Sequence, residues 1–525
     1  MAYNLFLHPL AKVPGPIFAR VSGIPSWYHA LRGDRHIWIW QLNQIYGAKV
    51  RIDPGTIIFF DPTSYNEIYS SSANVKKSRF YTALQRSHHE RNTLTTIDTQ
   101  LHAQKRKLLN LSFTEKSLRS ASRFMMTHID RWIELIAEEY EDGTEWTAPT
   151  DFAERANVLV FDIMGDLCFG NSPNIKEPGE NPFKSMPHNI ATYLKFWYPV
   201  SAYLLVKPII MILQITRSPF LGFILWLRPR GFDALMAKIT PPEIKSYYQF
   251  VHDSITQRSS LQEELREKPE SQQRLDMFHF LRESKNPDTG APAYSQEELW
   301  AEANLLILAG ADTTAISLCG IFFYLVRDQI RLEKLAYEIR STFTSANDIV
   351  PGQKLQSCTY LRACIDEGMR LAPAGPSELG REIKPGGATI NGEHYPAGTV
   401  VGVAAWAQTR NEVYGDPLVF RPERWIVDIA NGVTEEYISL CRNNFHFFGR
   451  GPGSCPGKNM ALLEMMLTVA KTLHRLDIRK ATGDTLGEGS PDQQWGQRDR
   501  NILQMQDAYV SILQGPAVQF RKRKL

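Results

Sequence analysis

Apolar residues recur at helical spacing through much of the chain. From Leu118 to Tyr140 they repeat every three or four positions, which predicts a helix with one face in the core. A longer apolar stretch begins at the capping box Ser295-Gln296-Glu297-Glu298 and continues to about Arg327. A third run, from Asn459 to about Leu473, follows a glycine-rich loop. The pattern therefore predicts a mainly helical protein.

The stretch from Ser295 to Arg327 would reach about 50 Å as a single helix, at 1.5 Å per residue. It is long and apolar enough to suggest a membrane span. Its interior, however, carries polar residues that would be costly to place in lipid: Glu302, Asn304, Asp312, Thr313 and Thr314. We therefore expect a buried helix that crosses the core.

Segments with the pattern of β-strands lie towards both ends of the chain. Apolar residues flank Pro54-Gly55 between Lys49 and Phe60, which predicts a strand pair about a turn. Asn391-Gly392 is typical of a β-hairpin, and further strands are expected at Thr399–Ala405 and Ala508–Leu513. Small sheets combined with a helical majority predict an α+β fold that is mainly α.

The most apolar part of the chain is residues 196–227, which Pro199, Pro208 and Pro219 divide into short pieces. Its aromatic residues stand beside basic ones, a mixture that suits a segment dipping into the membrane interface. A lid over a hydrophobic substrate channel is the alternative, and both can hold together. Residues 1–16, which end in Pro14-Gly15-Pro16, hold no apolar run long enough for a span. We expect peripheral membrane binding.

Composition and charge narrow the function. Hydrophobic residues make up 43% and charged residues 22% of the 525 residues, as in ordinary globular proteins, and we expect one domain over residues 1–525. The net charge of +3 is too small to indicate a nucleic-acid partner. The six cysteines are scattered without Cys-x-x-Cys spacing, which argues for a reducing compartment and against structural zinc.

One cysteine stands where a loop becomes a helix. Cys455 follows a run with three glycines, which allow a large flat group to lie close to the backbone: Gly449, Gly451 and Gly453. The free N–H groups and the dipole of the next helix are expected to lower the pKa of the thiol. A thiolate at this place can ligate a metal. A lone cysteine is more often an inert buried residue, so this interpretation depends on other motifs.

The run Phe448-x-x-Gly451-x-x-x-Cys455-x-Gly457 resembles the haem-binding loop of the cytochrome P450 family, whose cysteine thiolate ligates haem iron. Glu367-Gly368-Met369-Arg370 and Phe420-Arg421-Pro422-Glu423-Arg424-Trp425 resemble two further family motifs, in the same order. The resemblance begins near Tyr3. It implies the cytochrome P450 fold, with haem b between the long helix and the cysteine loop, Cys455 as axial ligand, and a buried network of Glu367, Arg370 and Arg424.

The resemblance also implies the other site residues. Asp312 and Thr313, in Ala309-Gly310-Ala311-Asp312-Thr313-Thr314, would be the catalytic pair that delivers protons during oxygen activation. The residues expected to bind the cofactor are His102, Arg106, Arg381, Phe448 and Arg450. Two positions depart from the family: Gly453 replaces a usual basic residue and Thr409 a frequent histidine, both of which normally help to hold the haem propionates.

The implied activity is that of a haem-thiolate monooxygenase acting on a hydrophobic small molecule. The chain has no convincing flavin or dinucleotide motif, so electrons are expected from NADPH through a separate NADPH-cytochrome reductase. The resemblance to filamentous-fungal members suggests a tailoring step on a polyketide or terpenoid secondary metabolite, at the cytosolic face of the endoplasmic-reticulum membrane. The alternatives are a haem-thiolate isomerase or dehydratase, against which Asp312-Thr313 argues, and a non-catalytic haem sensor.

Overall fold

The computed structural model describes residues 1–85, 91–140, 145–203, 242–266, 268–269, 273–286 and 289–523. Most of the apolar segment 196–227 lies outside these residues, so its role as lid or membrane contact stays a prediction. Its first residues belong to a helix that extends to Tyr203 and includes Pro199 within it. The expectation that Pro199 divides the segment is therefore wrong.

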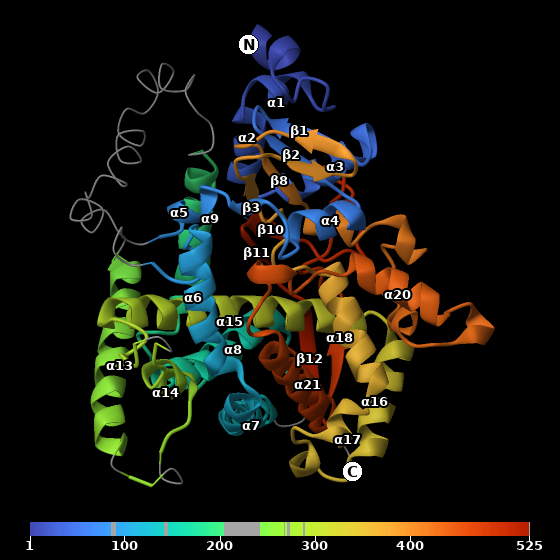
Figure 1. The fold of residues 1–525 in the computed structure, drawn as a ribbon. Coiled ribbons are helices and arrows are strands. Elements are labelled where there is room, and N and C mark those ends of the chain that lie inside the picture. Colours follow the sequence, from blue (N-terminus) through green and yellow to red (C-terminus); the bar gives the residue numbers. More distant parts are fainter. Residues whose placement is uncertain are drawn as a thin grey trace.

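Helices form most of the described chain (Figure 1). The α-helices are α1 (Ile17–Val21), α2 (Ile24–Arg32), α3 (Arg35–Tyr46), α4 (Pro62–Tyr69), α5 (Phe80–Ala83), α6 (Thr99–Leu109), α7 (Glu115–Glu138), α8 (Phe152–Phe169), α9 (Met186–Tyr203), α13 (Pro242–Arg266), α14 (Met277–Arg282), α15 (Gln296–Leu325), α16 (Gln329–Thr342), α17 (Gln353–Gln356), α18 (Thr359–Leu371), α19 (Ala405–Gln408), α20 (Glu435–Asn444) and α21 (Lys458–Arg475). Short π or 3-10 helices include η1 (Tyr3–Leu7), η2 (Asn110–Phe113) and η7 (Pro422–Trp425).

Helix α15 crosses the middle of the molecule (Figure 1). The Ser295 side chain accepts from the backbone N–H of Glu298, and the Glu298 side chain accepts from that of Ser295, so the predicted capping box is present. Among the described residues, α15 is the one helix long and apolar enough for a membrane span, and 67% of its apolar 18-residue window is buried within the protein. This burial confirms the expectation of a core helix.

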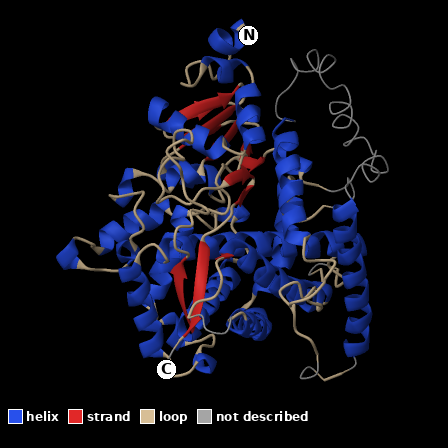
Figure 2. Ribbon diagram, turned by 180° about the vertical axis from the view of Figure 1, so that it is seen from behind, coloured by secondary structure: helices blue, strands red, loops and turns tan. Residues whose placement is uncertain are grey.

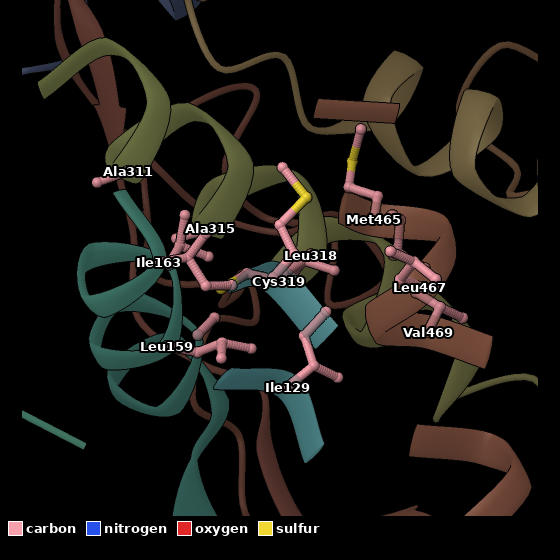
Figure 3. Packing of buried hydrophobic residues seen from close by; sticks show 14 of the residues in the cluster. Ile129, Leu159, Ile163, Ala311, Ala315, Leu318, Cys319, Met465, Leu467 and Val469 are labelled. Carbon is pink, nitrogen blue, oxygen red and sulfur yellow. The ribbon is translucent and has the colours of Figure 1, made fainter. Parts of the chain in front are cut away.

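In the main core cluster, α15 packs against its neighbouring helices (Figure 3). Its fully buried members include Ile129 from α7, Leu159 and Ile163 from α8, Leu318 from α15 and Leu467 from α21. Because such a core is close-packed, α15 and α21 have fixed positions relative to each other. The cysteine loop, which directly precedes α21, is thereby held in place.

The strands form small sheets that lie near the N-terminal end, near the centre and in the lower half of the view in Figure 2. They are β1 (Lys49–Asp53), β2 (Thr56–Phe59), β3 (Val75–Lys77), β4 (Thr150–Asp151), β5 (Arg381–Ile383), β6 (Ala388–Ile390), β7 (Glu393–Tyr395), β8 (Val400–Val403), β9 (Leu476–Lys480), β10 (Gln506–Ala508), β11 (Val510–Ile512) and β12 (Ala517–Lys522). The larger sheet has the order β1-β2-β8-β5-β3, with β2 and β8 parallel, and a second sheet has the order β4-β12-β9.

Two strand predictions have different outcomes. The hairpin at Asn391-Gly392 is confirmed, since both residues have positive φ between β6 and β7. The single strand expected at Ala508–Leu513 is wrong, because Tyr509 has a φ of 72° and the chain reverses there to form the hairpin of β10 and β11. The residues through this turn are almost all apolar or aromatic, so the pattern alone does not show it.

Candidate functional site

The cysteine loop is held by a hydrogen bond within it and by contacts with α6 and η2. Within it, the Cys455 N–H donates to the carbonyl of Phe448 over 2.7 Å. Arg106 of α6 donates through Nη1 to the carbonyl of Ser454 over 2.6 Å. A Cβ on Gly457 would lie 3.5 Å from the Phe113 ring of η2. These contacts fix the position of the Cys455 thiol.

Glycine is required at one position of this loop, and a second glycine lies against an arginine side chain. Gly451 has a φ of 62°, and a Cβ there would lie 2.1 Å from the Tyr69 carbonyl oxygen of α4. A Cβ on Gly453 would lie 2.6 Å from Nη2 of Arg381, which belongs to β5. A side chain at Gly453, the departure noted above, would have to displace the flexible end of Arg381.

The expected lowering of the Cys455 pKa is wrong. The residue is exposed at the loop, yet the protein surrounding its sulfur raises the pKa of the thiol through burial. The Gly457 N–H and the cations Arg106 and Lys458 oppose this rise only in part. The helix start favours the thiolate as predicted, but the sequence does not show how strongly the rest of the fold desolvates it.

Four basic residues gather beside the loop with no ion pair to a carboxylate among the described residues: Lys77, His102, Arg106 and Arg381. Lys77 and Arg381 are register partners in β3 and β5. Burial, together with Lys77, Arg106 and Arg381, lowers the pKa of His102 to about 4. Burial and Arg381 lower the pKa of Lys77 to about 7. The Glu302 carboxylate acts on Lys77, and a dianionic ligand would supply the group with further negative charge.

The structure brings His102, Arg106 and Arg381 together. Arg450 is exposed, and its charge acts on Tyr65 and His446, the first of which Arg381 also reaches. Phe448 packs against the main core cluster with Lys458 Nζ 5.9 Å from its ring centroid. The other departure, Thr409, is buried, and its carbonyl accepts from Arg370 over 2.7 Å.

Lys77 and Glu302 were missed by the sequence reasoning. Lys77 Nζ donates to the carbonyls of Thr93 and Leu94, each over 2.8 Å, in the loop before α6. The Thr93 hydroxyl donates over 2.8 Å to Glu302 of α15, and Lys105 Nζ lies 4.0 Å from the same carboxylate. Burial raises the pKa of Glu302 to about 7. Neither residue belongs to a recognisable motif, so no sequence signal indicated them.

Asp312 and Thr313 lie on the middle part of α15. The Thr313 hydroxyl donates over 2.7 Å to the carbonyl of Ala309, one turn earlier. Asp312 makes no hydrogen bond to a described residue, and burial alone raises the pKa of its carboxyl to about 7. A carboxyl with such a pKa can both hold and release a proton near neutral pH, which suits a proton relay.

The buried network expected around Glu367 is present. Arg370 donates to both Glu367 oxygens over 2.9 Å, and Arg424 of η7 donates to Oε1 over 2.9 Å. All three side chains have no exposed surface. Burial opposes the charge of Glu367, but Arg370 and Arg424 hold the pKa of its carboxyl below its usual value. The network connects α18 to the chain that leads to the cysteine loop.

These residues fit haem. The loop carries an exposed thiol and a glycine, Gly451, that admits no side chain, and the nearby basic group, which forms no ion pair to a carboxylate among the described residues, suits the two carboxylates of the porphyrin. Cys455 would be the ligand to iron. Lys77, Arg106 and Arg381 would pair with the carboxylates, with His102 as a neutral hydrogen-bond donor.

Comparisons with known proteins also indicate a cytochrome P450. A family model described as cytochrome P450 matches residues 229–489. The cytochrome P450 monooxygenase apf7 of Gibberella fujikuroi is 32% identical over 99% of this chain and 95% of its own length. The monooxygenase fscF of Fusarium equiseti is also 32% identical, over 99% and 93%, and poxM of Penicillium oxalicum is 31% identical, over 99% and 91%.

Proposed function

Because the chain belongs to the cytochrome P450 family as a monooxygenase, we propose that it oxidises a hydrophobic polyketide or terpenoid in a tailoring step of fungal secondary metabolism. The relatives that match almost the whole chain are fungal monooxygenases, which supports the fungal setting. The observation that carries the oxygen-activating role is the acid–alcohol pair Asp312-Thr313 on a buried helix, because an isomerase that rearranges a peroxide needs no proton delivery.

In this proposal each group of residues has a separate role in binding haem or in transferring protons. Haem held by the Cys455 thiolate would supply the oxygen chemistry, since thiolate ligation favours O–O cleavage and insertion of one oxygen atom into a C–H bond. Arg381 and Lys77 would orient the group through its carboxylates. Thr313 would hold a proton donor beside the reacting oxygen, and Asp312 would resupply that donor with protons.

We further propose that electrons come from NADPH through a separate reductase and that the protein works at the surface of the endoplasmic-reticulum membrane. An exposed apolar N-terminal surface supports the membrane contact: Tyr3, Phe6, Leu7, Ile17 and Phe18. Phe6 is 77% and Phe18 80% exposed. Asn4 donates to the Val21 carbonyl over 3.2 Å, which packs η1 on α1 and makes one surface of the two. An exposed apolar surface of this kind can insert at the boundary between the lipid headgroups and the acyl chains of a membrane.

A comparison of metabolites tests the proposal. A fungal host with the gene and one without it should differ by a hydrophobic compound that accumulates in the absence of the gene and lacks one oxygen atom relative to the product. Purified protein should then convert this compound only with NADPH and a reductase. Conversion without the reductase would instead identify an isomerase, and no change in metabolites would refute the tailoring role.

A further inference from the structure

Asp312 borders a cavity that the proposed mechanism has not yet used. The cavity measures about 40 Å³ and lies between α8, α9, α15 and β11. Each helix contributes residues from a single face: Ala153 and Asn157; Pro187, Ala191 and Leu194; Asp312, Ile316 and Cys319. A water molecule needs roughly 10–15 Å³ of such space and two to four polar partners. The cavity can therefore hold water if its walls offer polar atoms.

Two of the lining side chains offer free polar atoms. Asn157 and Asp312 make no hydrogen bond to any residue that the structure describes, and both are partly buried. The Ser511 hydroxyl, in contrast, donates to the Pro373 carbonyl over 2.8 Å. The remaining walls are apolar or carry the Cys319 thiol. Water in this cavity would therefore be held chiefly between the amide of Asn157 and the carboxyl of Asp312.

No cation among the described residues lines the cavity. The ionisable groups near Asp312 are Tyr247 of α13 and Cys319 of α15, and burial raises the pKa of both well above their ordinary values, so both are neutral. The Asp312 carboxyl thus has no counter-ion that would hold it permanently ionised. Its readiness to exchange protons depends on the polar groups of the cavity.

We propose that this cavity is the entrance for protons to Asp312, and that Asn157 positions the water from which Asp312 takes them. The inference rests on the proposed relay by Asp312 and Thr313. It adds the route and a positioning residue on α8, 155 positions away in the sequence. Close packing between α8 and α15, which is more extensive than between any other two described helices, holds the two residues in a fixed arrangement.

The proton balance is simple. Once Asp312 has given its proton to the site, its carboxylate takes one from the cavity water, so an O–H bond forms on the carboxyl and one breaks on the water. That water is restored by a proton from solvent. The net change is the transfer of one proton from solvent to the active site, with no change in oxidation state at either residue.

The first test needs no turnover. Infrared titration of the ferric protein follows the carboxyl stretch that disappears in Asp312→Asn. The parent should titrate near pH 7, and Asn157→Leu should raise the midpoint, because an apolar side chain expels the water that solvates the carboxylate. Asn157→Ser, which keeps a polar group and room for water, should restore a midpoint close to that of the parent.

The second test measures oxidation of NADPH through a fungal reductase in H2O and D2O, which requires no identified substrate. Asn157→Leu should slow oxidation on the order of 10-fold and raise the solvent isotope effect, a smaller loss than the 10²–10⁴-fold typical of a missing acid–base group. Ser511→Ala is the matched control. It also removes a polar group from the cavity wall, but one whose proton is already donated elsewhere, so both values should stay at those of the parent.

An Asn157→Leu protein with the carboxyl midpoint and isotope effect of the parent would overturn the proposed route. If Asp312→Asn in the same assay slows oxidation, the relay survives and only the entrance is wrong; if Asp312→Asn also matches the parent, the relay itself fails. Should Asn157→Leu not fold, Ala191→Met fills the same cavity from α9 and is judged by the same two criteria.

Discussion

At the scale of single residues, Cys455 carries the cofactor assignment. Cys455→Ala should abolish the thiolate-type Soret band of the reduced, carbon monoxide-treated protein, because no other exposed cysteine exists among the described residues. Cys441→Ala, which changes a buried cysteine in another core cluster, should keep the band and serves as the control. An unchanged band in Cys455→Ala would show that another residue ligates the iron.

Substitutions of Thr313 and Asp312 should have different effects on turnover. With the substrate identified from the metabolite comparison, Thr313→Ala should continue to consume NADPH but release hydrogen peroxide in place of product, because the hydroxyl no longer holds a proton donor beside the oxygen. Asp312→Asn should slow the whole cycle, by about 10²–10⁴-fold for a lost acid–base group. A Thr313→Ala protein with the product yield per NADPH of the parent would contradict the relay.

Glu302 should make the stability depend on pH. Burial raises its pKa from 4.5 to about 7 in the folded protein. Between these values the folded state binds more protons at this site than the unfolded state, so its contribution to stability falls as the pH rises. Glu302→Gln cannot titrate and still accepts from Thr93, so its melting temperature should fall less than that of the parent between about pH 5 and pH 8.

Glu298 provides the control for this titration. Although burial opposes it, Lys105 lowers the pKa of the Glu298 carboxyl, so its contribution to stability is present at neutral pH and disappears only in acid. Glu298→Gln should therefore change the melting temperature by a similar amount throughout the same pH range. Equal pH slopes for the parent and Glu302→Gln would show that the Glu302 pKa is not raised.

At the scale of elements, the Glu367 network links α18 to η7 through buried ion pairs. Glu367→Ala would leave Arg370 and Arg424 buried without an anion, and removing one partner of a buried pair costs about 3–5 kcal/mol. We expect little soluble haem protein. Glu435→Ala, at an exposed position of α20, should express normally. Normal yield and turnover of Glu367→Ala would show that the network does not support the fold.

At the scale of the whole molecule, the membrane contact can be divided between two regions. Changing Phe6, Leu7 and Phe18 to serine should weaken flotation with phospholipid vesicles, because these exposed side chains would lose their apolar contact with the bilayer. Changing Trp197, Phe223 and Trp226 to serine tests the segment 196–227 in the same way. If a variant floats with the vesicles as well as the parent does, the region that it changes does not contact the membrane.

Local signals in the sequence identified much of the fold and the centre of the site. The period of apolar residues and the capping box predicted α15 almost to its ends, and α7 within a few residues. Asn391-Gly392 predicted its hairpin, and the glycine-rich motif predicts Cys455 as the ligand to iron. These features depend on residues that are neighbours in the chain, whose backbone hydrogen bonds and side-chain periodicity are visible in one sequence.

Only the tertiary structure decided which distant residues complete the site. It places Arg381 against Gly453, Lys77 beside Arg381, Thr93 on Glu302, and Asn157 in the same cavity as Asp312. It also reverses the expected pKa shift of Cys455, because desolvation comes from every segment packed around the sulfur. Such contacts join residues far apart in the chain, and neither their geometry nor the local loss of solvent is encoded in any short pattern.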